Sequence, residues 1–119
     1  MATGTFEGSN VVLLWTNPSP ASSFAGQTIP LDLSNYDAVI VLTAMDTSAS
    51  GQLVVDSLIT PVGYGSRSVI QWNVRYIRQY EVSTSGVSFN DGAKGNVGAN
   101  ASTDNTVGIP YQIYGIRKL

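Results

Sequence analysis

The chain has 119 residues, a length that a single hydrophobic core can organise as one domain spanning 1–119. Hydrophobic residues make up 43% of the sequence, which excludes a disordered chain, whereas charged residues make up only 12%. The net charge of −2, without any basic patch, argues against nucleic acid as a partner. Cysteine and histidine are absent, which excludes disulfides, Cys/His zinc sites and any mechanism that needs an imidazole base.

The first residues contain no targeting signal. Residues 1–7 have neither a basic region nor an apolar stretch, so we expect no signal peptide. The longest apolar runs, 11–15 and 38–42, are far shorter than the roughly 20 residues of a membrane-spanning helix. We therefore expect a soluble protein, made in the cytoplasm of the cell that produces it and not inserted into a membrane.

The elements expected along the chain are β-strands, because β-branched and aromatic residues cluster between Gly, Asn, Asp, Ser and Pro. No segment has the apolar spacing of a helix. In chain order, the predicted strands are 10–16, 27–33, 36–45, 52–60, 67–72, 74–83, 87–90 and 109–117. Such short strands, with turn signals every 8 to 12 residues, predict an all-β, antiparallel β-sandwich or jelly-roll-like single domain.

Two predicted strands have apolar residues on both faces. Residues 38–42 are continuously apolar, which is typical of a central strand, and we expect Val39 and Val41 to lie in the core. In 10–16, Val11, Leu13 and Trp15 should face one way and the intervening residues the other. A two-layer sandwich cannot cover so much apolar surface by itself, so we expect a homo-oligomer.

Two segments are predicted to be surface loops. Residues 93–108 consist mostly of Gly, Asn, Ser, Thr and Ala and have no periodicity, which indicates a long loop. The glycines Gly63 and Gly65 flank Tyr64 in a second, shorter connection. Because recognition residues often lie on loops, both segments are candidate contact regions.

No catalytic or metal-binding motif stands out. Glu81 and Asp91 flank one predicted hairpin and could approach each other as an acid pair, but a solvated strand residue and a turn-forming Asp explain them better. Asn90, Asp91 and Asn96 could offer oxygens to calcium, although Asx turns account for the same residues. We therefore expect no catalytic residue, no metal and no cofactor.

The aromatic residues are the better candidates for binding. Their flat faces suit stacking on a sugar ring or burial at an interface, although most aromatic side chains in a sandwich pack in its core. The residues chosen as a candidate binding set are Tyr64, Trp72, Tyr111 and Tyr114.

Several segments of the sequence are similar to a module of bacteriophage virion proteins. They are LWTNPSP at 14–20, FAGQTI at 24–29, LDLSNYD at 31–37, GVSFNDG at 86–92 and IPYQIYGI at 109–116. The module occurs as the terminal domain of tail, baseplate or fibre components, so the resemblance implies a virion-surface location, other virion proteins as partners and, by analogy with fibre tips, a trimer. The matched segments are turns and strands, and the resemblance names no active residue.

The leading hypothesis is a non-enzymatic virion structural protein, an exposed knob or accessory subunit of a tail tip, fibre or capsid surface, with a host surface glycan as a further partner. The alternative is a stand-alone carbohydrate-binding module, which needs two or three exposed coplanar aromatic residues on one sheet face. A small glycan hydrolase is a third reading, which the lack of a motif around any acid pair disfavours.

Overall fold

The structure is a computed structural model and describes residues 10–118. The strands are β1 (Val11–Thr16), β2 (Gln27–Pro30), β3 (Tyr36–Asp46), β4 (Val55–Pro61), β5 (Gly65–Gln71), β6 (Val74–Ser83), β7 (Gly86–Phe89), β8 (Ala93–Asn96), β9 (Ser102–Thr103) and β10 (Val107–Arg117). One 3-10 turn, η2 (Gly51–Leu53), precedes β4. The predicted absence of a signal peptide concerns residues 1–7, which lie outside the described part.

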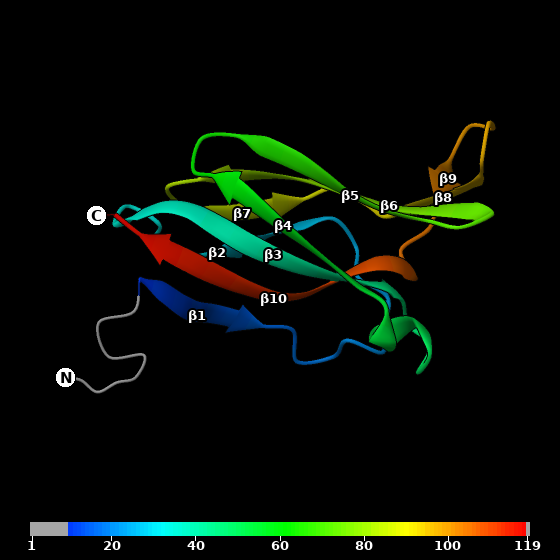
Figure 1. Cartoon of the computed structure of the whole chain (residues 1–119), viewed down its shortest axis with the longest axis horizontal. Coiled ribbons are helices and arrows are strands. Elements are labelled where there is room, and N and C mark those ends of the chain that lie inside the picture. Colours follow the sequence, from blue (N-terminus) through cyan, green and yellow to red (C-terminus); the bar gives the residue numbers. More distant parts are fainter. Residues whose placement is uncertain (1–9, 119) are drawn as a thin grey trace.

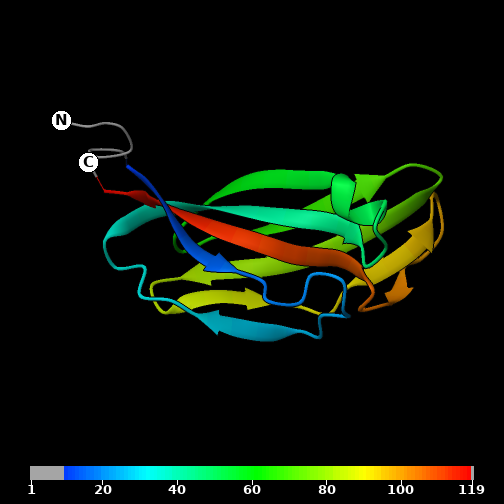
Figure 2. The same cartoon turned by 90° about the horizontal axis from the view of Figure 1, so that it is seen from below.

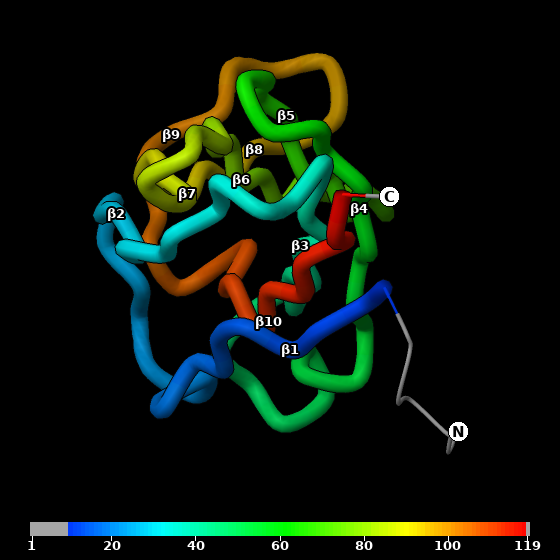
Figure 3. The backbone as a smooth tube through the Cα atoms, turned by 90° about the vertical axis from the view of Figure 1, so that its left-hand side faces the viewer, coloured from blue at the N-terminus to red at the C-terminus, as the bar shows by residue number. Residues whose placement is uncertain are grey.

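The strands form two antiparallel sheets that pack face to face, as the all-β sandwich prediction requires (Figures 1 and 2). The four-stranded sheet has the order β1-β10-β3-β4, and the six-stranded sheet has the order β2-β7-β6-β8-β9, with β5 on the other side of β6. One side of the sandwich is joined by the short turn between β4 and β5. The other side is joined by residues 17–26, which cross from β1 to β2 (Figure 3).

The core lies between the two sheets. Val39 and Val41 on β3 are 0% and 1% exposed, which confirms the prediction that both are core residues. Across from them, Phe89 packs edge-on against Phe24, with ring centroids 5.5 Å apart, and lies 5.4 Å from the ring of Tyr80. Contacts of this kind stabilise a core beyond the area that they bury.

The strand around residues 10–16 differs from the strict alternation that the sequence predicts. The pairing of β1 with β10 shifts register between Leu13 and Trp15, as a β-bulge does. Val11 and Leu13 are exposed, as expected of one face, but Leu14 and Trp15 both pack against the core. The bulge thus turns Trp15 away from the face on which the period of two would place it.

Two further predictions about elements need correction. Residues 52–54 are not strand, because a turn at Ser48–Ser50 leads into η2 and β4 begins only at Val55. Residues 93–108 are not one long loop, because they form β8 and β9 and the start of β10. Small polar residues hide this hairpin from a hydrophobic pattern, but β8 pairs with the N-terminal half of β6 through backbone groups that any residue supplies.

A buried arginine holds this hairpin region to the core. The Arg78 side chain is 0% exposed and donates to the carbonyls of Asn90 (2.6 Å), Gly108 (2.8 Å) and Val107 (3.1 Å). Its guanidinium also lies 5.4 Å from the centre of the Phe24 ring. Gly108 has a φ of 57°, and a Cβ there would meet the Arg78 Cβ at 3.0 Å, so this position requires glycine.

Candidate functional site

The four aromatic residues chosen from the sequence do not come together. Tyr64 and Trp72 are 66% and 69% exposed, but they flank β5 at opposite ends, roughly 25 Å apart at about 3.3 Å per residue. Trp72 lies at the tip of the β5–β6 hairpin, where Val97 from the β8–β9 hairpin is also exposed (Figure 1). Tyr114 and Tyr111 belong to β10 in the other sheet and are partly buried. No shared platform results from these four side chains.

The two carboxylates considered as an acid pair lie in different surroundings. Asp91 accepts hydrogen bonds from the Gly26 amide (2.8 Å) and from Asn105 Nδ2 (3.2 Å). These two bonds, with a smaller contribution from nearby Arg78, lower the pKa of Asp91 below its usual value of 3.8. Glu81 instead lines an open groove on β5 and β6 beside Arg67 and Gln79, with a volume of about 400 Å³.

Acidic residues do not gather elsewhere in the part of the chain that the structure describes. Within residues 10–118 no group of three or more Asp or Glu side chains is placed to hold a metal ion. Asp104 accepts hydrogen bonds from the Thr106 hydroxyl (2.6 Å) and amide (2.9 Å), which lower its pKa. Both carboxylates of the 90–108 region, Asp91 and Asp104, therefore act as anchors for turns, as Asx residues commonly do.

A polar pair and a tyrosine lie inside the sandwich between β4, β5 and β6. Thr60 donates to the Ser66 hydroxyl at 2.7 Å, and Thr60 is 1% exposed. Burial raises the pKa of the neighbouring Tyr80 hydroxyl by more than the Thr60 and Ser66 hydroxyls lower it. A tyrosine with a raised pKa stays protonated near neutral pH, so this group is no ready base or nucleophile.

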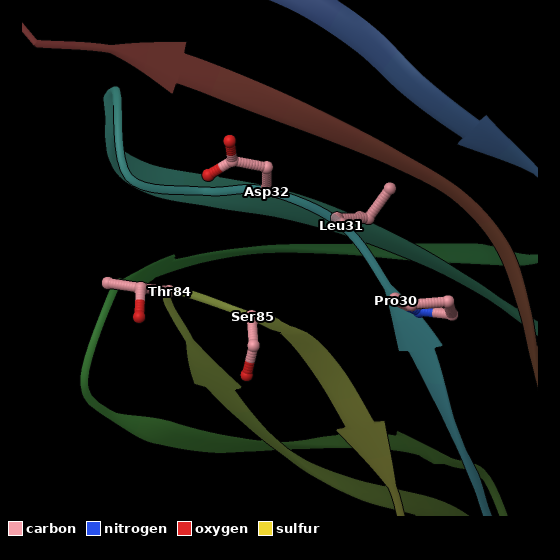
Figure 4. A pocket seen from close by; sticks show the side chains of 5 residues that line it. All are labelled: Pro30, Leu31, Asp32, Thr84 and Ser85. Atoms are coloured by element: carbon pink, nitrogen blue, oxygen red, sulfur yellow. The ribbon is translucent and has the colours of Figure 1, made fainter.

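An open groove lies where β2 ends beside the β6–β7 hairpin. Its volume is about 500 Å³, and Pro30, Leu31, Asp32, Thr84 and Ser85 line it. Figure 4 shows the side chains of Asp32 and Leu31 pointing away from those of Thr84 and Ser85. The Asp32 carboxylate already accepts from the Ser34 hydroxyl (2.7 Å) and amide (3.1 Å), which lower its pKa. Functional groups therefore do not converge in this groove.

A smaller pocket combines an aromatic wall with polar groups. This side pocket has a volume of about 310 Å³ and is lined by residues of β1, of β2 and of the segment 17–26. Figure 3 shows where this segment crosses between the two sheets. Trp15, Pro18, Phe24 and Ile29 form its apolar lining. Its hydrogen-bonding side chains are Asn17, Ser19, Ser23 and Gln27.

The shape of the side pocket follows from local sequence features. Thr16 ends β1 because two prolines follow, and Asn17 then turns the chain: its Oδ1 accepts the Ser19 amide (2.8 Å) and its Nδ2 donates to the Pro110 carbonyl (2.8 Å). Farther along, the Phe24 amide donates to the Asn105 carbonyl at 2.9 Å. These bonds fix the crossing segment at both ends, to β10 through Asn17 and to Asn105, just before β10, through Phe24.

The outer face of the four-stranded sheet has three neighbouring rows without a charged side chain. Each row in it contains one residue from each strand, in the order β1, β10, β3 and β4. The rows are Leu13–Tyr114–Ile40–Ile59, Val11–Ile116–Ala38–Pro61 and Thr16–Gln112–Leu42–Ser57. Ile59, Leu13 and Val11 are 64%, 48% and 42% exposed. We call these three rows the outer apolar face.

The dimensions of the outer apolar face match those of a contact surface. Strands lie about 4.8 Å apart and same-face residues about 6.8 Å apart, so the nine apolar positions, all except Thr16, Gln112 and Ser57, cover roughly 300 Å². The largest apolar patch on a typical monomer has this size and is often functional. The apolar residues on both faces of 10–16 already indicated a surface of this kind. No periodic signal indicated the side pocket, because Trp15 reaches it only through the bulge in β1.

Comparison of the chain with protein-family models, with curated proteins and with solved structures finds no match. No helix within residues 10–118 is long and apolar enough to cross a membrane.

Proposed function

We propose that this protein is a non-enzymatic structural protein of a bacteriophage virion, an exposed knob or accessory subunit of a tail tip, fibre or capsid surface. The observation that carries the proposal is the outer apolar face. Twelve neighbouring positions without a charged side chain suit burial against protein, since a partner can cover them without desolvating an unpaired charge. The virion setting rests on the resemblance of segments 14–20, 24–29, 31–37, 86–92 and 109–116 to virion modules.

The partner on this face is proposed to be the chain itself, in a homotrimer, together with neighbouring virion proteins. Symmetric self-association is the common way for one chain to cover such a surface. Light scattering of the purified protein tests this part. We expect a mass three times the 12.6 kDa of the chain. Most specific interfaces have a dissociation constant below about 100 μM. A single species of 12.6 kDa at protein concentrations up to that value would therefore contradict self-association.

The location on the particle needs its own test. A cryo-electron microscopy map of phage that carries this protein with a C-terminal tag should show tagged density on the tail tip, fibre or capsid surface. Normal particles that lack the tag altogether would overturn the virion proposal, whatever the oligomeric state.

Contact with a host surface glycan is a further part of the proposal. Tyr64 follows Gly63, whose φ of 101° and open surroundings allow the turn to present an exposed ring. We expect Tyr64→Ala, and separately the replacement of 97–100 by a Gly-Ser linker of the same length, to weaken binding of particles to host cells. The replacement stops short of Asp104 and Asn105, because their hydrogen bonds to Gly92 hold the fold. Unchanged cell binding in both variants would exclude these loops as the contact.

The alternative of a stand-alone carbohydrate-binding module with an aromatic platform has less support. Tyr64 and Trp72 lie at opposite ends of β5, and Tyr114 lies in the other sheet. A platform needs neighbouring coplanar rings on one face, and these three residues do not provide it.

A further inference from the structure

We propose that the side pocket binds one pyranose ring of an uncharged carbohydrate. In this site Trp15 would be the wall on which the sugar ring stacks, and Ser19, Ser23 and Gln27 would be its hydrogen-bonding groups. The ligand class agrees with the proposed glycan contact, but the site is a new one, and its test does not depend on particle assembly.

The Trp15 ring is held in place before any ligand arrives. It packs edge-on against Phe24, with centroids 6.2 Å apart and planes at 70°, and Phe24 packs edge-on against Phe89 in the core. A ring fixed in this way loses little conformational freedom on binding, so more of the contact energy contributes to affinity. The Trp15 indole N–H makes no hydrogen bond to residues 10–118, which leaves a donor for a sugar hydroxyl.

The polar side chains of the pocket divide into anchored and available groups. Asn17 is 6% exposed, and both its Oδ1 and its Nδ2 already make hydrogen bonds within the fold. It therefore shapes the pocket and is not available to a ligand. Gln27 donates through Nε2 to the Ala25 carbonyl at 3.0 Å, which leaves its Oε1 as an acceptor. The hydroxyls of Ser19 and Ser23 make no hydrogen bond within residues 10–118 and can donate and accept.

Charge and size restrict the ligand further. None of the residues that line the side pocket is charged, so a phosphate or carboxylate would lose its hydration without a compensating partner. A purely aliphatic ligand would in turn leave the serine and glutamine groups unpaired. A volume of about 310 Å³ is at the lower end of small-molecule sites, which suits a single ring. A sugar combines an apolar ring face with a rim of hydroxyls and meets all three conditions.

Nuclear magnetic resonance can read the site directly, because the sequence contains only two tryptophans. Full-length ¹⁵N-labelled protein therefore gives two indole N–H signals, which Trp72→Phe assigns. The probes are the methyl glycosides of glucose, galactose, mannose, rhamnose and N-acetylglucosamine, each titrated to about 20 mM because single-ring ligands bind near millimolar. We expect at least one glycoside to shift the Trp15 signal saturably and to leave the Trp72 signal in place. No shift at Trp15 with any of the five, or a shift at Trp72 alone, would overturn the proposal.

A matched pair of variants tests the role of Gln27. Gln27→Leu removes an exposed amide from the pocket, whereas Gln79→Leu removes an exposed amide from the outer face of β6. Loss of one good hydrogen bond should weaken glycoside binding about tenfold in Gln27→Leu and leave it unchanged in Gln79→Leu. Equal affinities in the two variants would refute the assigned contact. Because particle incorporation is measured separately, failure of this inference and failure of the proposed function remain distinguishable.

Discussion

Side chains alternate between the inner and the outer face in both sheets, but the outer faces of the two sheets differ in polarity. In the four-stranded sheet, the row across β1, β10, β3 and β4 reads Leu13–Tyr114–Ile40–Ile59. In the six-stranded sheet, the row across β2, β7, β6 and β5 reads Thr28–Ser88–Glu81–Gly65, and all four residues are exposed. One outer row is therefore polar and the other apolar, although both sheets pack their inner faces into the same core.

The buried charge also belongs to the six-stranded sheet. The six-stranded sheet, whose outer face is polar, also carries the buried guanidinium of Arg78 on its inner side. The four-stranded sheet has its apolar residues on both sides. A charged group can therefore be buried where its hydrogen bonds are satisfied. The Arg78 guanidinium meets this condition because three backbone carbonyls accept its hydrogen bonds.

The largest expected effect is on stability, and it distinguishes the inner from the outer side chains of β3. Val41→Asp places a carboxylate in the core, which should cost several kcal/mol and remove most of the roughly 5–15 kcal/mol of a small domain's stability. Ile40→Asp, on the adjacent outward position, should leave the chain folded and abolish self-association. Chemical denaturation and light scattering measure the two quantities. Unchanged unfolding of Val41→Asp would show that the inner face is assigned wrongly.

Arg78→Met tests the interior of the six-stranded sheet. The variant keeps most of the side-chain volume but leaves the carbonyls of Asn90, Val107 and Gly108 without their donor. We expect a loss of about 2–4 kcal/mol in the free energy of unfolding. The control Arg67→Met, at an exposed position of β5, should change stability by less than about 0.5 kcal/mol. Equal effects of the two substitutions would mean that the buried hydrogen bonds contribute nothing.

A lysine on each outer face compares the two surfaces directly. Ile59→Lys introduces a charge into the outer apolar face and should weaken self-association at least tenfold, because the charge must lose water in the interface. Ser88→Lys, on the polar face, should leave the oligomer intact. Sedimentation equilibrium measures both. Association of the unmodified protein should also depend little on salt, since the twelve positions carry no charge.

The smallest expected effect is that of acidic pH on the free energy of unfolding. The pKa values of Asp32, Asp91 and Asp104 are lowered in the folded chain, so their contribution to stability is present above about 3.8 and is lost as the pH falls below that value. Without histidine, stability should be flat between about pH 5 and 8. Asp91→Asn should flatten part of the acid-side loss. A denaturation series over pH measures this, and a strong slope between pH 5 and 8 would contradict it.

Much of the architecture follows from local pattern. The continuous apolar run 38–42 predicted a central strand with Val39 and Val41 in the core, and both are buried there. The strand predicted at 10–16 also ends where the sequence indicates, because Pro18 and Pro20 follow Thr16 closely. Residues 93–108 were predicted as loop because their side chains are small and polar. In the structure β8 pairs with β6 and β9 pairs with β8 through backbone groups, and Arg78 binds carbonyls on both sides of this hairpin.

For the candidate sites, too, local sequence pattern predicts one part and tertiary structure decides the other. The sequence by itself determined that the protein is a β-sandwich with apolar residues on both faces of some strands, because a period of two and β-branched runs are local properties. Only the tertiary structure decided which residues share a surface. Register aligned Leu13, Tyr114, Ile40 and Ile59 into one row, a single bulge turned Trp15 into the side pocket, and the length of β5 kept Tyr64 and Trp72 apart. The physical reason is that strand pairing joins residues far apart in the chain, and one extra residue in a strand redirects the side chains beyond it.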